Sequence, residues 1–148
     1  MDKICFLDRD GIINVKPPEH QHCLSWNDFH FLPNVKSAIE YIHNKGYKIL
    51  IVTNQREVPK EIYEDIHTKL KKEIPLIEKF YVCDHPKGKC NCHKPAPGLF
   101  YKAEFDYNID KKHSLMIGDQ DTDVIAGEAY GIKSYKTNDL YKLVKEIL

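Results

Sequence analysis

Short apolar runs alternate with helix-like segments along most of the chain. The runs read KICFL, KILIVT, KFYVC, SLMIG and IKSY, at residues 3–7, 48–53, 79–83, 114–118 and 132–135. The middle runs are apolar at consecutive positions, which is typical of parallel strands buried on both faces. The pattern therefore predicts five strands.

The segments between these runs carry helical periodicity. In NVKSAIEYIHNKG the apolar residues Val35, Ala38, Ile39 and Ile42 follow helical spacing, and Gly46 stands where a helix stop is expected. Four further helices are expected at residues 62–70, 99–107, 122–130 and 138–148. Parallel strands need crossover connections, so the alternation predicts an α/β fold. We expect a doubly wound, Rossmann-like, five-stranded and mainly parallel sheet with helices on both faces.

Chain length and net charge indicate a single domain and give no sign of a nucleic-acid or membrane partner. The 148 residues predict a single domain over 1–148, with no stretch long enough for a separate cap domain. Basic and acidic residues both number 22, so the charge pattern offers no footprint for nucleic acid or an anionic membrane. No apolar run approaches the roughly 20 residues of a membrane span. We expect a soluble, cytoplasmic monomer that acts on a small molecule.

The five cysteines do not favour a disulfide framework. Their number is odd, and the first residues, MDKICFLDRDG, place acids where a secretory signal would be apolar. Reduced thiols or metal ligands are the better expectation. Cys5 lies within a central strand and is expected to belong to the core.

Polar residues follow three of the expected strands at the point where each ends. The first strand runs into Asp8 and Asp10, the second into Thr53 and Asn54, and the fourth into a loop that contains Asp119 and Asp123. Ligands of open parallel sheets bind beyond the carboxyl ends of the strands, where strand order reverses. Acids gathered there would repel one another without a cation, and their oxygen ligands suit Mg²⁺.

Each motif by itself has a simpler interpretation. DRDG is also a common turn sequence, TNQ could only cap the next helix, and GDQDTD could be a loop followed by a cap. Their coincidence at three strand ends favours a functional site.

These motifs also resemble a known family. FLDRDGIIN, IVTNQ, CHKPAPG and IGDQDTD are similar to the four motifs of the haloacid dehalogenase superfamily of phosphohydrolases. The likeness extends from Ile4 to about Tyr135. Within the superfamily it is greatest to the zinc-containing branch that includes heptose 1,7-bisphosphate phosphatases and histidinol-phosphate phosphatases.

The resemblance implies a phosphoaspartyl mechanism. Asp8 would attack phosphorus, and Asp10 would protonate the leaving oxygen and then activate water. Gly11 would permit the tight turn between them. Thr53, the backbone amide of Asn54 and Lys94 would bind the phosphate oxygens. Mg²⁺ would be held by the carboxylates of Asp8 and Asp119 and the carbonyl of Asp10, while Asp123 would orient Lys94 or a metal-bound water.

The stretch CDHPKGKCNCHKP predicts a second metal site. Cys83, His85, Cys90 and Cys92 form C-x-H and C-x-C half-sites around the loop PKGK, a closed set suited to tetrahedral Zn²⁺. Four protein ligands leave no open position, so the zinc is expected to be structural and to fix Lys94. His93 is the competing ligand, although we expect it to face the substrate. The irregular segment Asn14–Pro33 could suggest a further metal site through His20, His22, Cys23 and His30, but their spacing is irregular, and we expect this segment to roof the active site.

The chain departs from the branch near the substrate. The usual loop after TNQ is shorter here, His93 stands where arginine is common, and Gln120 where lysine is frequent. We expect a sugar bisphosphate such as D-glycero-D-manno-heptose 1,7-bisphosphate, its second phosphate bound by Arg56. Histidinol phosphate is the alternative. A nucleic-acid-end phosphatase and an inactive zinc-stabilised binding module are further alternatives.

Overall fold

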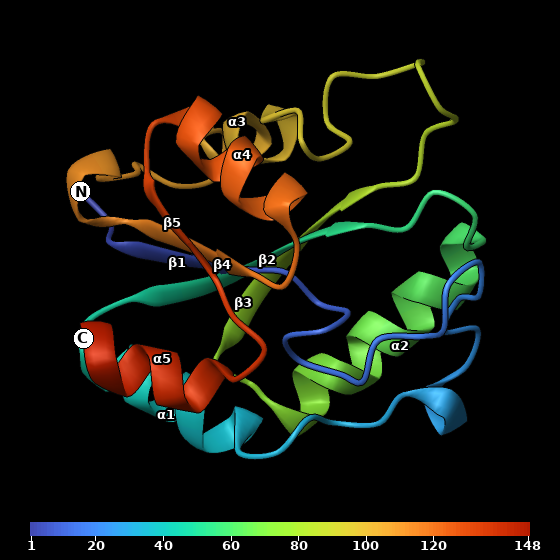
Figure 1. Cartoon of the computed structure of the whole chain (residues 1–148), viewed down its shortest axis with the longest axis horizontal. Helices are drawn as coiled ribbons and strands as arrows, with labels where there is room; N and C mark the ends of the chain where they lie inside the picture. The colour runs from blue at the N-terminus through green and yellow to red at the C-terminus, as the bar shows by residue number, and fades with distance from the viewer.

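The computed structural model, which describes residues 1–148, is built on one sheet of five parallel strands (Figure 1). Every neighbouring pair is parallel, and the strand order is β3-β2-β1-β4-β5. The strands are β1 (Ile4–Leu7), β2 (Lys48–Asn54), β3 (Ile77–Cys83), β4 (Leu115–Gly118) and β5 (Lys133–Lys136). The predicted α/β fold is confirmed, and the sheet expected to be mainly parallel is wholly so.

Five α-helices cover the two faces of the sheet. One face carries α1 (Val35–Asn44), α2 (Lys60–Glu73) and α5 (Leu140–Ile147), and the other carries α3 (Gly98–Ala103) and α4 (Asp121–Tyr130) (Figure 1). Two short 3₁₀ helices, η1 (Trp26–Asp28) and η2 (Lys111–His113), lie in the connections. The chain does not add a cap domain to this layered arrangement.

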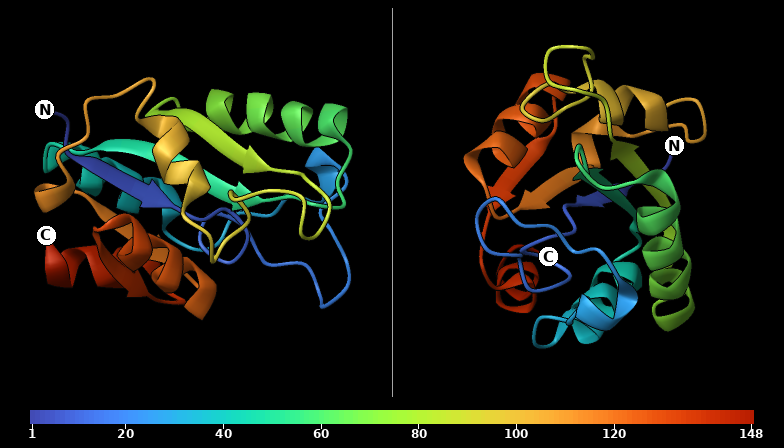
Figure 2. Two further views of the ribbon diagram at one scale, coloured as in Figure 1. Left: turned by 90° about the horizontal axis from the view of Figure 1, so that it is seen from above. Right: turned by 90° about the vertical axis from the view of Figure 1, so that its right-hand side faces the viewer.

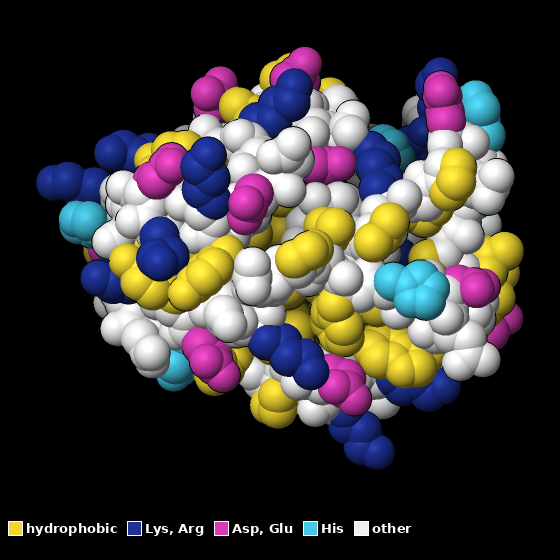
Figure 3. All heavy atoms as spheres, turned by 60° about the horizontal axis from the view of Figure 1, so that its bottom comes forward, with side chains coloured by type: hydrophobic (Ala, Val, Ile, Leu, Met, Phe, Trp, Pro, Cys, Tyr) yellow, Lys and Arg dark blue, Asp and Glu magenta, His cyan; other side chains and the backbone are white.

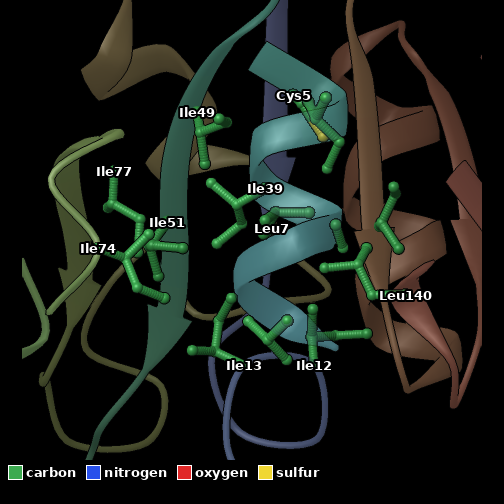
Figure 4. Close-up of a cluster of buried hydrophobic side chains, with 14 of the residues drawn as sticks. Cys5, Leu7, Ile12, Ile13, Ile39, Ile49, Ile51, Ile74, Ile77 and Leu140 are labelled. Carbon is green, nitrogen blue, oxygen red and sulfur yellow. The ribbon is translucent and has the colours of Figure 1, made fainter. Parts of the chain in front are cut away.

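The core beneath α1 shows why the apolar stripe forms a helix here. Val35, Ala38, Ile39 and Ile42 are all buried, and Figure 4 shows Ile39 directed toward Leu7 and the isoleucines of β2. Burying each large aliphatic side chain stabilises the fold by about 1.5–3 kcal/mol before entropy is counted. Gly46 ends the helical segment with φ of 91°, as its position predicted. Cys5 is fully buried in the same cluster, as expected.

Two segments differ from the sequence-based expectation. The third helix ends at Ala103 instead of Tyr107, and turns follow it. The carboxylate of Asp106 accepts hydrogen bonds from Lys79 Nζ at 2.6 Å and Tyr81 Oη at 2.7 Å, which ties this segment to β3. The segment expected to be irregular contains η1, which Ser25 caps by accepting from the backbone N–H of Asp28.

The strand order places the ends of β1, β2 and β4 side by side. The chain leaves β1 for β2 and β3 on one side, then returns to β4 on the other side of β1. Strand order therefore reverses beside β1, and the loops that follow the strands gather at that end of the sheet (Figure 2).

The charges on one face of the surface are mixed in sign (Figure 3), and the helices are not of the membrane-spanning kind. The face shown in Figure 3 carries basic and acidic side chains interspersed, without one dominant sign. No helix has both the length and the apolar character needed to cross a bilayer.

Candidate active site

A buried ion pair joins the end of β1 to the loop after β3. Lys94 Nζ donates to Asp8 Oδ1 at 2.9 Å, to Asp123 Oδ1 at 2.6 Å and to the carbonyl of Val52 at 2.9 Å. Lys94 is only 3% exposed and Asp8 only 8%. All three N–H groups of the ammonium are thus satisfied, which fixes the position of its charge.

This cluster contains more negative than positive charge. Burial opposes the charge of Lys94, but Asp8 and Asp123 outweigh it and raise the pKa of Lys94. Burial raises the pKa of Asp8 to about 7, against the attraction of Lys94 and with the repulsion of Asp123. One ammonium between two carboxylates leaves one negative charge uncompensated, and the raised pKa of Asp8 reflects this.

Asp119 completes an acidic group that fits a divalent cation. Carboxylate oxygens of Asp8, Asp119 and Asp123 lie within 4.8 Å of one another. Asp119 Oδ1 is buried and has no hydrogen-bond partner, so it lacks the compensation that buried carboxylates need. Gly11, at φ of 90°, passes so close to Asp119 that a Cβ atom there would overlap its carboxylate. The all-oxygen donor set and the unpaired oxygen fit Mg²⁺.

Asp123 is held in place by the start of α4. Its Oδ2 accepts from the backbone N–H of Gln120 at 3.1 Å, and the Gln120 side chain caps the same turn reciprocally. Its Oδ1 then faces Lys94. Asp123 therefore contacts Lys94 directly, which is one of the two orientations that the sequence predicted.

Asp10 lies beside Asp8 in a network of hydrogen-bond donors. Its Oδ1 accepts from Arg9 and Asn14, and its Oδ2 accepts from Gln55 Nε2 at 3.0 Å. Burial tends to raise its pKa, but the charge of Arg9 and the donated hydrogen bonds hold the pKa of Asp10 below its ordinary value. The ionised carboxylate is thus stabilised in the absence of a substrate.

Sequence reasoning missed Arg9 and its partner on α2. Arg9 is fully buried, and its Nη1 lies 3.0 Å from His67 Nε2. The two residues are 58 positions apart, and His67 belongs to an ordinary helical pattern. The sequence offered one signal, an arginine between two aspartates directly after a buried strand. A guanidinium buried there requires acceptors, so a further acceptor near Arg9 could have been expected.

The two polar residues at the end of β2, Thr53 and Asn54, form hydrogen bonds with different neighbours. Thr53 Oγ1 accepts from Gln55 Nε2 at 3.0 Å and lines the cleft beside Asp8. Asn54 uses its side chain on the backbone of Lys94, accepting from its N–H at 3.1 Å and donating to its carbonyl at 3.3 Å. The Asn54 amide thereby fixes Lys94, a contact that sequence spacing did not indicate.

A polar cleft of about 180 Å³ opens over these groups. Its lining includes Asp8, Asp10, Thr53, Lys94 and Asp123. It also contains Lys16, from the segment expected to roof the site, and Gln120 and Thr122 at the start of α4, which the sequence did not mark as lining. Lys16 Nζ lies 3.6 Å from Asp119 Oδ2, and its side chain is 47% exposed. A larger groove of about 470 Å³ between α2 and β3 contains none of the predicted site residues. The chemistry of the side chains therefore makes the smaller cleft the candidate site.

Two predicted substrate contacts lie outside that lining. Arg56 Nε donates to the carbonyl of His85 at 3.0 Å, which directs this side chain to the cysteine-rich loop. His93 Nδ1 is buried without a partner, and burial together with the charges of Arg56 and Lys94 lowers the pKa of His93.

The cysteine-rich loop brings its four predicted ligands together. Cys83, His85, Cys90 and Cys92 offer ligand atoms within 4.8 Å of one another. Cys83 Sγ lies 3.5 Å from Cys90 Sγ and 3.6 Å from His85 Nδ1, while Cys92 Sγ lies 3.2 Å from His85 Nδ1. Tetrahedral zinc would separate such ligands by roughly 3.5–3.8 Å. Hydrogen bonding from the backbone of Cys92 lowers the pKa of Cys90 to about 6. The cluster fits zinc, and His93 is not part of it.

Comparisons with known proteins agree with this chemistry. A family model described as haloacid dehalogenase-like hydrolase matches residues 12–136. The D-glycero-beta-D-manno-heptose-1,7-bisphosphate 7-phosphatase of Haemophilus ducreyi is 33% identical, over 89% of this chain and 80% of that protein. The corresponding alpha-anomer phosphatase of Photorhabdus laumondii is 32% identical, over 88% of this chain and 79% of that protein.

A solved structure shares the fold. It is the D,D-heptose 1,7-bisphosphate phosphatase of B. bronchiseptica complexed with magnesium and phosphate, with a TM-score of 0.83 and 22% identity. The match covers 99% of this chain and 87% of that one.

Proposed function

Because the chain belongs to the haloacid dehalogenase-like hydrolase family and is a phosphatase, we propose that it hydrolyses a small sugar bisphosphate through a covalent aspartyl phosphate on Asp8. The observation that carries this proposal is the contact of Asp8 and Asp123 with one buried lysine, at the edge of a polar cleft. We further propose that residues 1–148 form one domain and act as a monomer.

Asp8 is the nucleophile in this proposal. Its carboxylate attacks phosphorus while Lys94 holds positive charge against the phosphate oxygens, and the Thr53 hydroxyl donates a hydrogen bond to one of them. The bonds from Lys94 to Asp123 and Val52 support this role, because they keep the ammonium in place when Asp8 becomes phosphorylated. The backbone amide of Asn54 is the second proposed donor to the phosphate.

Asp10 transfers the protons. It gives a proton to the leaving oxygen in the first half-reaction and takes one from the attacking water in the second. Its position in the cleft, with a low pKa in the free protein, supports the second role directly. A phosphate dianion close to the carboxylate raises its pKa, which favours the protonated form needed first.

The acidic group is the proposed magnesium site. The carboxylates of Asp8 and Asp119 and the carbonyl of Asp10 would hold the ion, and the buried unpaired Asp119 Oδ1 supports this assignment. When bound, Mg²⁺ supplies positive charge that offsets the repulsion between an anionic nucleophile and an anionic phosphate. The zinc proposed at Cys83, His85, Cys90 and Cys92 is structural.

The substrate assignment depends on the names of the relatives and on the charges at the cleft. The two relatives described above are 7-phosphatases of heptose 1,7-bisphosphate, which supports a sugar bisphosphate here. Lys16 supports a second anionic group, because it is the one lining cation besides Lys94 and half of its side chain is exposed. Histidinol phosphate carries an ammonium and an imidazole, for which the predicted rim offers the acids Glu19, Asp28, Glu57 and Asp84. Each already has a partner: Glu19 has His20, Asp28 has Ser25, Glu57 has His22 and Asp84 has Tyr63.

A phosphate-release screen tests this function. Purified protein would be assayed with heptose 1,7-bisphosphate, other sugar bisphosphates, their monophosphates and histidinol phosphate, with Mg²⁺ and with a magnesium chelator. We expect Mg²⁺-dependent turnover with kcat/KM highest for a bisphosphate. Higher kcat/KM for histidinol phosphate would reject the substrate class, and no turnover of any phosphomonoester would reject the proposed mechanism.

A further inference from the structure

We propose that His67, acting through Arg9, is a positioning residue that directs the transferable proton of Asp10 to its Oδ2 atom. This inference rests on the proposed function, in which Asp10 is the general acid. His67 is located on α2, outside the cleft, and no motif of the active site contains it.

The two carboxylate oxygens of Asp10 have different hydrogen-bond partners. Oδ1 accepts three hydrogen bonds, from Arg9 Nε at 3.1 Å, Arg9 Nη2 at 2.9 Å and Asn14 Nδ2 at 2.8 Å. An oxygen facing three N–H groups has no free lone pair and no room for a proton of its own. Oδ2 has one donor, Gln55 Nε2. The proton that Asp10 gives to a leaving oxygen therefore belongs on Oδ2.

Arg9 lies between Asp10 and His67 and contacts both. Its planar guanidinium presents the Nε and Nη2 edge to Asp10, while Nη1 points to His67 Nε2 at 3.0 Å. A guanidinium can only donate, so Nε2 must be the unprotonated nitrogen and the ring proton must be on Nδ1. Arg9 is fully buried, so loss of this acceptor would leave an N–H group without a partner and free the guanidinium to turn.

The imidazole ring of His67 is packed against an aromatic side chain of β3. His67 is 6% exposed and stacks on Phe80 with ring centroids 4.3 Å apart and planes 7° apart. Burial and the charge of Arg9 lower the pKa of His67 to about 3, which keeps the imidazole neutral and able to accept. The ring is therefore fixed in both plane and protonation state. Packing alone would explain the stacking, but it would not require an acceptor nitrogen facing Arg9.

Leaving-group dependence separates positioning from packing. An alkyl phosphate needs its leaving oxygen protonated, whereas p-nitrophenolate departs without a proton. The value of kcat/KM reports the steps up to departure of the leaving group. We would compare an alkyl sugar phosphate with p-nitrophenyl phosphate for wild type, His67→Phe, His67→Gln and the exposed α2 control Glu64→Gln. His67→Phe preserves the stacking but removes the acceptor, and glutamine restores an acceptor.

The expected pattern is selective. His67→Phe should lower kcat/KM for the alkyl phosphate about tenfold, which is a part of what general acid catalysis contributes. The same variant should lower kcat/KM for p-nitrophenyl phosphate less than about twofold. His67→Gln should recover most of the loss, and Glu64→Gln should match wild type. Equal losses on both substrates, or no loss, would overturn the proposal. If phenylalanine does not fold, methionine provides a second apolar replacement.

Two references make the outcome unambiguous. Asp10→Asn should show the same selectivity, and if it does while His67→Phe does not, the positioning role is wrong and the proposed function survives. If Asp10→Asn is not selective, the general-acid assignment fails and this inference fails with it. In wild-type protein, long-range ¹H–¹⁵N spectra at neutral pH should show His67 protonated on Nδ1, and a proton on Nε2 would overturn the proposal without any variant.

Discussion

Lys94 Nζ lies 2.9 Å from Asp8 Oδ1, although 86 positions separate the two residues in the chain. The strand order creates this contact, since β1 ends beside β2 and the loop after β3 returns over both. Both side chains are almost fully buried, so removing either charge would leave the other without compensation unless a third group remains. Asp123 is that group, because it also accepts from Lys94.

Asp8→Asn should abolish phosphate release and leave the fold intact. The substitution removes the nucleophile, while Lys94 keeps Asp123 and the carbonyl of Val52 as partners. We expect less than about one per cent of wild-type kcat, in line with the large losses seen when a catalytic group is removed. Steady-state phosphate release and circular dichroism measure the two effects.

A neighbouring acid provides the control for that substitution. Asp121 is 82% exposed and pairs only with Lys136, at the surface between the start of α4 and the end of β5. Asp121→Asn should retain wild-type turnover, because a solvated ion pair contributes little. Turnover of Asp8→Asn well above one per cent, with a normal control, would show that another group is the nucleophile.

The positions of the acids could be read from the sequence because they follow strands. Asp8 and Asp119 each come directly after a buried apolar run, Thr53 ends another, and parallel strands bring their carboxyl ends to one edge. The cysteine set was equally readable, since C-x-H and C-x-C are local spacings. Neither inference required knowledge of how distant segments pack.

Contacts that depend on packing could not be read in this way. Lys16 lies in the segment expected to roof the site, but that segment has no periodicity, so the sequence did not single out Lys16 as the residue beside Asp119. The partnership of Arg9 with His67 depends on the way α2 packs beside the segment that follows β1. Arg56 was expected at the rim because of its charge, yet its Nε donates to the carbonyl of His85, a backbone acceptor that no residue pattern reveals.

The protein as isolated should contain about one zinc per chain, and zinc loss should lower both stability and turnover. Asn54 fixes the backbone of Lys94, two residues after Cys92, so disorder in the loop would reach the ammonium. Cys90→Ser should reduce zinc content and lower Tm by on the order of 10 °C. Elemental analysis and calorimetry measure these effects, and Cys23→Ala, outside the cluster, is the matched control for zinc content. Zinc-free protein purified without chelator would contradict the assignment.

The stability of the fold should decline below pH 6.5 because of His67. Its pKa is lowered from 6.5 to about 3 in the folded state, so between these values the unfolded chain binds a proton that the folded chain does not. Stability therefore falls as pH falls, by about 2 kcal/mol between pH 7 and pH 5 from this group.

Chemical denaturation of wild type and His67→Gln at both pH values measures this contribution. Glutamine does not titrate, so the variant should lose about 2 kcal/mol less than wild type over the same interval. Identical losses in the two proteins would mean that His67 titrates normally in the folded state.

Lys16→Ala should weaken turnover of a sugar bisphosphate more than turnover of the matching monophosphate. In the free protein Lys16 Nζ lies 3.6 Å from Asp119 Oδ2, and a cation bound at Asp119 would offset that attraction and leave the ammonium free for a second phosphate. A charge-assisted contact of this kind is worth about 1–2 kcal/mol at a half-exposed site, so kcat/KM for the bisphosphate should fall about tenfold. The loss should shrink as salt is added.

Arg56→Ala should be less selective, because Arg56 is occupied by the carbonyl of His85 and lies outside the lining of the cleft. Lys60→Ala, an exposed partner of Glu64 on α2, controls for the loss of one positive charge. If Arg56→Ala distinguishes the two substrates and Lys16→Ala does not, the second phosphate is bound at the cysteine-rich loop instead of beside Asp119.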